Sequence, residues 1–229
     1  MRIFETTFRQ KFAACLMLCA PFAAHAAEYT TIETSTIEWE QDPSDIVRET
    51  SNAAASQFKL ASFGPFNVVS NGVAELVGSI ETGSAAQFKQ MLAAYPGINQ
   101  INMIDCPGTN DDAANFQIAR MIRKSGINTY IPDGGSVRSG GVELFLAGIR
   151  RVAEPTAEFA VHSWQDEDGL EADDVPANDP VNLEYIKYYR EIGMDEQKAR
   201  AFYAMTNSVP HDSALYLNRR DIAAYLPLD

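Results

Sequence analysis

Two residues whose side chains could do nucleophilic chemistry follow clear structural signals in the second half of the chain. Ser139 comes after a glycine-rich turn and directly before Gly140-Gly141 and an apolar run that predicts a buried helix. Backbone N–H groups and the positive end of a helix dipole beside such a serine would stabilise an oxyanion. His162 ends a short apolar segment, residues 159–161, that is typical of a buried strand. Loops that follow strands often carry catalytic residues, so we expect Ser139 to be the nucleophile and His162 its general base.

Each of these residues also has a purely structural explanation. Serine is favoured at helix N-termini without any chemistry, and a histidine after a buried strand can be an interior side chain with satisfied hydrogen bonds. The two residues together, in this order, favour the catalytic interpretation. Ser136 is the alternative nucleophile, and His211, next to Pro210, is predicted to be a surface residue.

The elements that must position these residues alternate between strands and helices. Residues 66–69 and 73–80 flank Ser70-Asn71-Gly72, a pattern that predicts a hairpin. We then expect a helix capped by Ser84 and ending near Tyr95, a strand over 98–105, a helix over 113–124 and a strand over 129–131. Strands that alternate with helices through short connections indicate βαβ units and a largely parallel sheet. The predicted fold class is α/β, in a single domain over residues 61–229.

The part of the chain after His162 is sharply acidic before it becomes helical. Residues 165–180 carry many carboxylates, which predicts a solvated loop, with a lid or a metal loop as the alternative. Their spacing does not match the EF-hand pattern, so no metal ion or other cofactor is predicted. The remaining expected elements are helices over 181–192 and 195–205, a strand over 215–217 and a closing helix capped by Asn218.

The N-terminus has the pattern of a secretory signal peptide. Arg2, Arg9 and Lys11 precede an apolar run over residues 12–24, and Ala24-His25-Ala26 provides the small residues that a signal peptidase needs. The run is shorter than the roughly 20 residues that span a bilayer. We therefore expect cleavage after Ala26, a periplasmic or secreted protein, and no membrane span in the mature chain. Residues 27–60 are predicted to form a polar arm, extended or poorly ordered.

Composition limits the partners of the mature chain. The whole chain has a net charge of -13, and loss of three basic residues and one acidic residue with the signal peptide would make it -15. Such a charge argues against nucleic acids and anionic membrane surfaces as partners. Cys106 would be the sole remaining cysteine, which excludes an internal disulfide. We expect its side chain to be buried, because it ends an apolar strand.

Three blocks of residues, in order, resemble a known family. The first is residues 73–80 (VAELVGSI) with the later strand that ends Asp105-Cys106-Pro107-Gly108; the second is residues 139–148 (SGGVELFLAG); the third is residues 155–162. In this order they resemble the Clp protease proteolytic subunit and the wider Clp/crotonase superfamily, in particular an exported branch of it. The resemblance covers roughly residues 65–228 and implies a Clp/crotonase-like ββα superhelix.

The resemblance also implies roles for individual residues. Ser139 would be the nucleophile, His162 the general base and Asp212 the third member of the triad. The backbone N–H of Gly140, with that of Gly108 or Thr109, would form the oxyanion hole. Two features depart from the family pattern: Thr109 replaces a second glycine, and Asp212 lies further upstream than the pattern requires.

These observations favour an exported serine hydrolase of the peptidase type that works without ATP. Its expected partners are a peptide or protein substrate and further copies of the same chain. The alternative is a non-catalytic exported module, on the same fold, for binding or assembly. A crotonase-type reaction on a thioester is less favoured, because coenzyme A would not be available to an exported protein.

Overall fold

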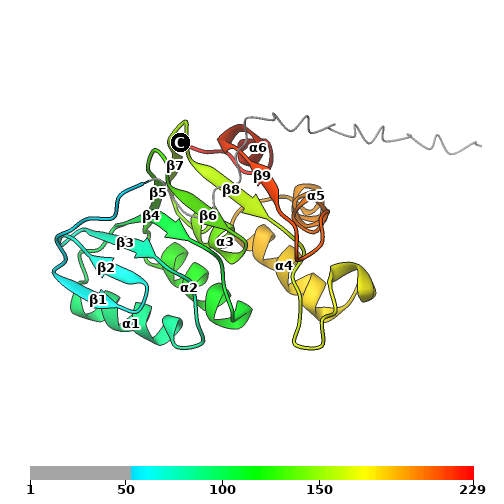
Figure 1. Ribbon diagram of the computed structural model, residues 1–229, viewed down its shortest axis with the longest axis horizontal. Coiled ribbons are helices and arrows are strands. Elements are labelled where there is room, and N and C mark those ends of the chain that lie inside the picture. Colours follow the sequence, from blue (N-terminus) through cyan, green and yellow to red (C-terminus); the bar gives the residue numbers. More distant parts are fainter. Residues whose placement is uncertain (1–52) are drawn as a thin grey trace, which may run out of the picture. The chain divides into compact units, whose positions relative to one another are not determined.

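The computed structural model describes residues 53–229 (Figure 1). The predicted signal peptide and most of the predicted arm lie outside these residues. The strands, in chain order, are β1 (Ala61–Phe63), β2 (Phe66–Val68), β3 (Val73–Val77), β4 (Gln100–Cys106), β5 (Asn128–Ile131), β6 (Ser136–Arg138), β7 (Arg151–Ala153), β8 (Glu158–Val161) and β9 (Leu215–Leu217). The helices are α1 (Ser84–Ala94), α2 (Asp112–Lys124), α3 (Gly140–Leu146), the 3₁₀ helix η1 (Ala172–Asp174), α4 (Pro180–Glu191), α5 (Glu196–Thr206) and α6 (Arg219–Tyr225).

The predicted hairpin is present and leads into a parallel sheet. β2 and β3 pair in antiparallel register around the turn at Ser70-Asn71-Gly72, with Phe66 opposite Leu76. β3 then pairs in parallel with β4. The strand ends at Val77, earlier than expected, and is followed by Gly78 with a φ of 117°. The antiparallel pairs among the described strands lie at the two ends of the sheet, where β1 pairs with β2 and β2 with β3, and where β9 pairs with β8.

A strand–strand–helix unit occurs twice in succession, as β5–β6–α3 and β7–β8–α4. The first strands of the two units pair with each other, β5 with β7, and the second strands pair likewise, β6 with β8. β4 pairs with β5 along its first half and with β6 along its second half. This arrangement confirms the predicted ββα superhelix and the largely parallel sheet.

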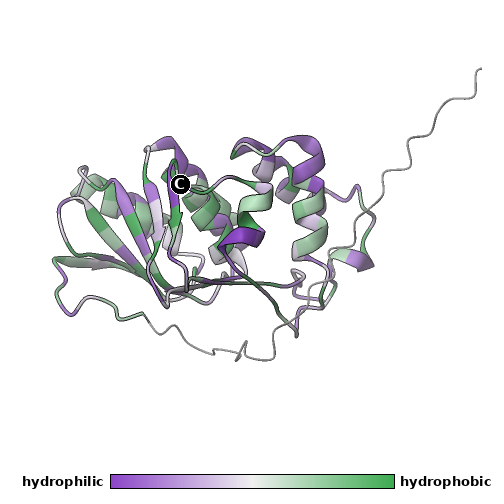
Figure 2. Cartoon of the chain, turned by 90° about the horizontal axis from the view of Figure 1, so that it is seen from above, coloured by the Kyte–Doolittle hydropathy of each residue, from purple (hydrophilic) through white to green (hydrophobic). Residues whose placement is uncertain are grey.

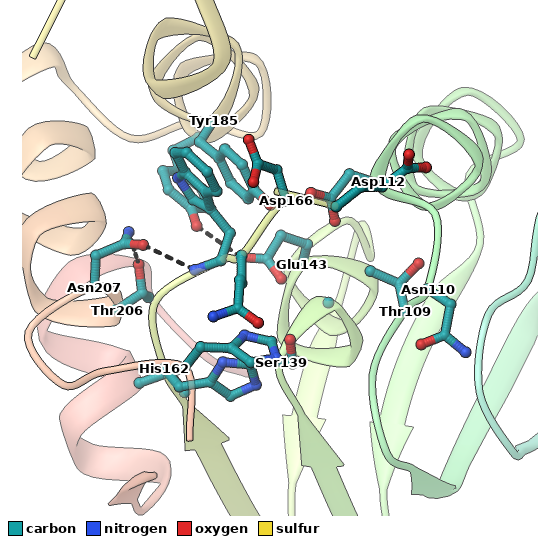
Figure 3. A pocket seen from close by; sticks show the side chains of 17 residues that line it. Thr109, Asn110, Asp112, Ser139, Glu143, His162, Asp166, Tyr185, Thr206 and Asn207 are labelled. Atoms are coloured by element: carbon teal, nitrogen blue, oxygen red, sulfur yellow. Dashed lines mark hydrogen bonds between the residues drawn. The ribbon is translucent and has the colours of Figure 1, made fainter. Parts of the chain in front are cut away.

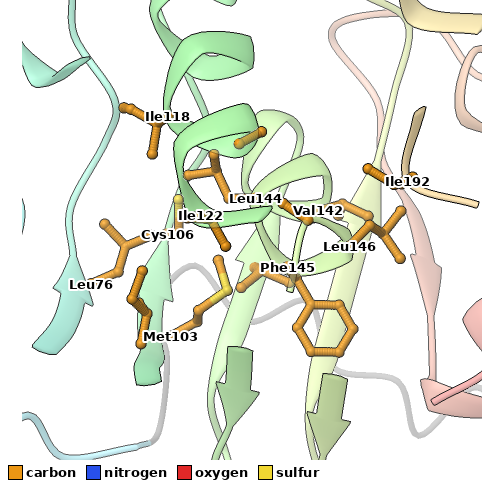
Figure 4. Packing of buried hydrophobic residues seen from close by; sticks show 14 of the residues in the cluster. Leu76, Met103, Cys106, Ile118, Ile122, Val142, Leu144, Phe145, Leu146 and Ile192 are labelled. Carbon is orange, nitrogen blue, oxygen red and sulfur yellow. The ribbon is translucent and has the colours of Figure 1, made fainter. Parts of the chain in front are cut away.

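The apolar core lies between the sheet and the helices α1, α2 and α3. Figure 4 shows the core around α3, whose residues Val142, Leu144, Phe145 and Leu146 are all fully buried. Cys106 is also fully buried, as predicted, and burial raises the pKa of its thiol to about 12. Hydrophobic and hydrophilic stretches alternate along the strands and helices in Figure 2, as expected of elements with one buried side.

Several details differ from the expectations. The predicted cap at Ser84 is wrong: Gly83 is the N-cap residue of α1, and the Ser84 hydroxyl instead accepts the N–H of Glu81 at 2.9 Å. β6 and β7 were not predicted, because three-residue strands beside glycine-rich or charged segments leave no periodic pattern. The cap of α6 at Asn218 is confirmed. In residues 53–229 no helix has the length and apolar character needed to cross a bilayer.

Candidate active site

Three neighbouring parallel strands end at the same edge of the sheet. β6 pairs in parallel with β4 on one side and with β8 on the other. Residues that follow such strands are brought together, because the carboxyl ends of parallel strands face the same crevice. Gly108 follows β4, Ser139 follows β6 and His162 follows β8. The sheet topology therefore brings together the residues that the sequence singled out.

The backbone of Ser139 has an unusual conformation. With φ 46° and ψ -128°, it is the one non-glycine residue with positive φ in the described part of the chain. Its N–H donates to the carbonyl of Ala160 on β8 at 2.8 Å, and its carbonyl accepts the N–H of Val142 at 2.9 Å. Such a conformation costs on the order of 1–3 kcal/mol and persists only where the surroundings hold it. Strain of this kind is typical of functional sites.

The capping explanation accounts for the position of Ser139 but not for its side chain. Ser139 is the N-cap residue of α3, yet its hydroxyl accepts no capping hydrogen bond. The side chain is half-buried and lines a cavity of about 320 Å³. The hydroxyl is therefore directed to a place where a substrate could reach it.

Glycines allow the backbone to approach the nucleophile closely. A Cβ atom on Gly108 would lie 2.9 Å from Cβ of Ser139, and one on Gly140 would lie 2.5 Å from the methyl group of Thr109. The N–H groups of Gly108, Thr109 and Gly140 donate to no acceptor within residues 53–229. They are the N–H groups expected to form the oxyanion hole.

The side chain of Thr109 is fixed by hydrogen bonds to the backbone around it. Its hydroxyl donates to the carbonyl oxygens of Asp111 and Ile80, at 2.9 and 3.3 Å, while its methyl group faces Gly140. The threonine in place of the family's second glycine thus packs against the turn, although it also forms part of the cavity wall.

His162 lines the same cavity as Ser139 (Figure 3). Its Nδ1 lies 2.8 Å from the carbonyl oxygen of Ser163. A carbonyl can only accept, so the neutral ring carries its proton on Nδ1 and leaves Nε2 as the basic nitrogen. Partial burial lowers the pKa of His162, the Ser163 carbonyl opposes this effect, and neighbouring His211 lowers the pKa further. No hydrogen bond joins Ser139 and His162 within the described structure, as is common in sites without substrate.

A second histidine, and not Asp212, accompanies His162. The rings of His162 and His211 lie edge to face, 4.6 Å between centroids, and Nδ1 of His211 is 3.0 Å from the same Ser163 carbonyl. Asp212 is exposed and accepts a hydrogen bond from the hydroxyl of Ser213 at 3.3 Å. It is not among the residues that line the cavity. Its role in the triad stays a prediction, because the described structure contains no hydrogen bond between Asp212 and His162.

The alternative nucleophile, Ser136, lies in a polar cluster within the sheet. Its side chain is 1% exposed, donates to Glu158 at 2.8 Å and accepts from Arg138, which also forms an ion pair with Asp105 at 2.8 Å. A serine with both roles of its hydroxyl taken up in this way has a structural function.

The residues that line the cavity include a buried acid that the sequence analysis did not predict as a site residue. Glu143, in the apolar run of α3, is 5% exposed, and it lines the cavity beside Ser139 and His162. The hydroxyl of Tyr189 donates to its carboxyl at 2.6 Å. Burial raises the pKa of Glu143 to about 7, and the bond from Tyr189 partly opposes the rise. A lone acid within an otherwise apolar helix was the signal that could have identified it.

Two solved structures are similar in fold to this chain. A single-residue mutant of ClpP1 from Listeria monocytogenes superimposes with a TM-score of 0.50 and 16% identity, covering 69% of this chain and 89% of that one. The chain has a ClpP-like fold. A mutant of the membrane-bound stomatin-specific protease 1510-N is also similar, with a TM-score of 0.47 and 20% identity, over 69% of this chain and 76% of that one. No family model and no curated protein matches the sequence.

The ClpP-like fold confirms the resemblance stated from the sequence and the predicted fold class. At such low identity the likeness establishes the fold alone, so the activity is argued from the site. Among the described residues, no three His, Cys, Asp or Glu side chains are grouped so that they could hold a metal ion.

Proposed function

We propose that the protein is a serine hydrolase, most plainly a peptidase, with Ser139 as nucleophile and His162 as general base. One observation carries the proposal: the strained serine at the start of α3 opens into a cavity that it shares with a half-buried histidine. The ClpP-like fold supports a peptidase in particular, because the similar structures include a protein named as a protease.

The contacts support a two-step reaction through an acyl-enzyme. Nε2 of His162 takes the proton of the Ser139 hydroxyl while Oγ attacks the substrate carbonyl carbon. The carbonyl oxygen gains the negative charge, which the N–H of Gly140 and that of Gly108 or Thr109 would stabilise. The protonated His162 then gives its proton to the leaving amine. Water, deprotonated by the same nitrogen, releases the acid and restores Ser139.

In this proposal the Ser163 carbonyl orients the base. It accepts from Nδ1 of His162 and fixes the tautomer, which is the positional part of what a triad carboxylate does. It cannot supply the full negative charge that stabilises an imidazolium. His211 donates to the same carbonyl and holds the segment in place. Asp212 is kept as the alternative third member.

A non-catalytic binding or assembly module is the second candidate. The observation that favours it is the absence, among residues 53–229, of a carboxylate hydrogen-bonded to His162. Without such a group the base is weaker, and the fold could be retained for binding alone. Reactivity of the Ser139 hydroxyl separates the two candidates.

Acyl-enzyme formation tests the proposal. The purified protein would be mixed with a p-nitrophenyl ester of an N-blocked amino acid, quenched in acid and weighed by intact-protein mass spectrometry. We expect one acyl group on Ser139 in the wild type and none in Ser139→Ala or His162→Ala. Folded wild-type protein that is never acylated across pH 6–9 would contradict the proposal.

Export and self-association belong to the same proposal. We expect the mature chain to begin at Ala27 in the periplasm or medium, and N-terminal mass analysis of the secreted protein would check this. We also expect homo-oligomers, because ClpP-like proteins assemble through their helices, and sedimentation velocity of the mature protein would measure their size.

A further inference from the structure

The cavity in front of Ser139 has two chemically different ends. Figure 3 shows Ser139 and His162 at one end, and Glu143 with Asp112 and Tyr185 toward the other. Helix α3 connects the ends, since Ser139 is its N-cap residue and Glu143 lies one turn later. One turn of helix advances about 5–6 Å. Glu143 therefore lies within reach of a side chain attached next to the attacked carbonyl.

Glu143 is an unexpected residue for its position. The other six residues of α3 are glycine or apolar, and all of them are buried. A buried carboxyl among them costs free energy unless a partner compensates for its lost solvation. Tyr189 provides one hydrogen bond, and the carboxyl also forms part of the cavity wall. A bound cation would supply the remaining compensation.

The other residues of the cavity wall also favour a cation. The other carboxylates in the cavity wall are Asp112, Asp166 and Glu167, and none of the described lining residues is Lys or Arg. Aromatic rings of Trp164, Tyr185 and Tyr189 line it as well. Aromatic faces and carboxylates around one space attract a positively charged group by cation–π contact and by charge.

We propose that this end of the cavity is a specificity subsite for a cationic side chain, lysine or arginine, at the residue whose carbonyl Ser139 attacks. Glu143 is the specificity-determining residue that pairs with the cation. The inference rests on the proposed hydrolase function. A lysine side chain extends roughly 6 Å from Cα to Nζ, which is comparable to the single helix turn between Ser139 and Glu143.

The ionisation of Glu143 agrees with this role. Because burial raises its pKa to about 7, the carboxyl of the free protein is partly neutral at neutral pH. A nearby ammonium or guanidinium favours the charged form of the carboxyl. The cavity can therefore be free of a fixed buried charge when empty and gain one when a basic side chain enters.

Phosphonate probes that differ in one side chain test the subsite. Diphenyl aminoalkylphosphonates with lysine, norleucine or glutamate side chains react when Oγ of Ser139 bonds to phosphorus and one phenol leaves with the hydroxyl proton. Norleucine matches the lysine chain closely without its charge. On the wild type we expect the lysine probe to react at least about tenfold faster than the norleucine probe, and the glutamate probe slowest.

Variants assign the preference to Glu143. Glu143→Gln keeps the volume and an acceptor for Tyr189, so we expect the lysine-to-norleucine rate ratio to fall to within about threefold of one. Asp168→Asn makes the same change from acid to amide at an exposed residue of the acidic loop that does not line the cavity, and it should leave the ratio unchanged. The ratio is independent of any loss in overall reactivity.

The outcomes separate this inference from the proposed function. A small fluorophosphonate without a side chain should label Ser139 whatever the subsite prefers, and failure of that reaction would reject the hydrolase itself. If the fluorophosphonate reacts but the lysine probe is no faster than norleucine, or neither reacts, the subsite is rejected alone. A ratio that persists in Glu143→Gln would remove Glu143 from the role.

Discussion

His162 and His211 share one acceptor, since Nδ1 of each ring lies within 3.0 Å of the Ser163 carbonyl oxygen. Their rings meet edge to face at 4.6 Å. Neighbouring His211 disfavours the charged form of His162 and so lowers its pKa. The pair therefore helps to keep His162 in the neutral form that a general base requires.

The first prediction concerns the pH dependence of the reaction. The pKa of His162 lies below 6.5, because of its burial first and of His211 in addition. The neutral base therefore persists at lower pH, and the acid limb of the kcat/KM profile should lie below pH 6.5. In His211→Asn, which keeps a donor for the Ser163 carbonyl, the limb should move to higher pH. An unmoved or lowered limb would contradict the coupling.

The second prediction separates the two candidates for the orienting group. Replacing a triad aspartate by asparagine typically lowers kcat by about 10⁴-fold. Asp212 is exposed and has no hydrogen bond to His162 in the described structure. If the Ser163 carbonyl orients the base, Asp212→Asn should lose less than about tenfold in the rate of acylation. A loss of a thousandfold, in a variant that unfolds at the wild-type temperature, would instead assign Asp212 to the triad.

The third prediction concerns the strain at Ser139. Glycine adopts positive φ at little cost, whereas alanine at φ 46° keeps the unfavourable backbone conformation. Ser139→Gly should therefore be more stable than Ser139→Ala by about 1 kcal/mol, offset in part by the entropy of the unfolded glycine chain. Urea unfolding of both variants measures the difference. An alanine variant as stable as the glycine variant would indicate that the conformation is not strained.

The fourth prediction concerns stability and Glu143. Its pKa in the folded protein, about 7, is above the ordinary 4.5 because the carboxyl is buried. The folded state therefore favours the protonated carboxyl. Protonation of Glu143 contributes fully to the free energy of unfolding below pH 4.5, and this contribution is lost as the pH rises through about 7. The loss amounts to on the order of 3 kcal/mol.

Glu143→Gln isolates this contribution from those of other carboxylates. The difference in unfolding free energy between the variant and the wild type should shift in favour of the variant from pH 5 to pH 8. Asp168→Asn, which removes an exposed charge, should show no comparable slope. A difference that is flat with pH would show that Glu143 ionises in the folded protein as readily as in water.

The sequence was most informative where a residue type is demanded by backbone geometry. Gly108, after the strand that ends at Cys106, and Gly140-Gly141, after Ser139, marked the turns because none of the three positions has space for a side chain: a Cβ would meet Ser139 at Gly108, Thr109 at Gly140 and Cys106 at Gly141. The apolar strand before His162 marked the other side of the site. Helices α2 and α4 were predicted because each has one buried face with apolar residues at helical spacing.

What could not be predicted depends on contacts between distant segments. His211 was taken for a surface residue: its side chain is exposed, but it lies beside His162 only because β9 returns antiparallel to β8. Glu143 was not predicted as a site residue, because it lies in an apolar run and the hydrogen bond that stabilises its buried carboxyl comes from Tyr189 of α4. Neither relationship has a local pattern in the sequence.

The most direct test of the central claim is labelling of the purified protein with a fluorophosphonate and location of the adduct by peptide mass spectrometry. The account predicts one adduct per chain, on Ser139, retained in Ser136→Ala and lost in Ser139→Ala and His162→Ala. Ser136→Ala is the matched control, because it removes a neighbouring serine hydroxyl that is buried outside the cavity. Folded wild-type protein without an adduct over pH 6–9, or an adduct on Ser136, would contradict the account.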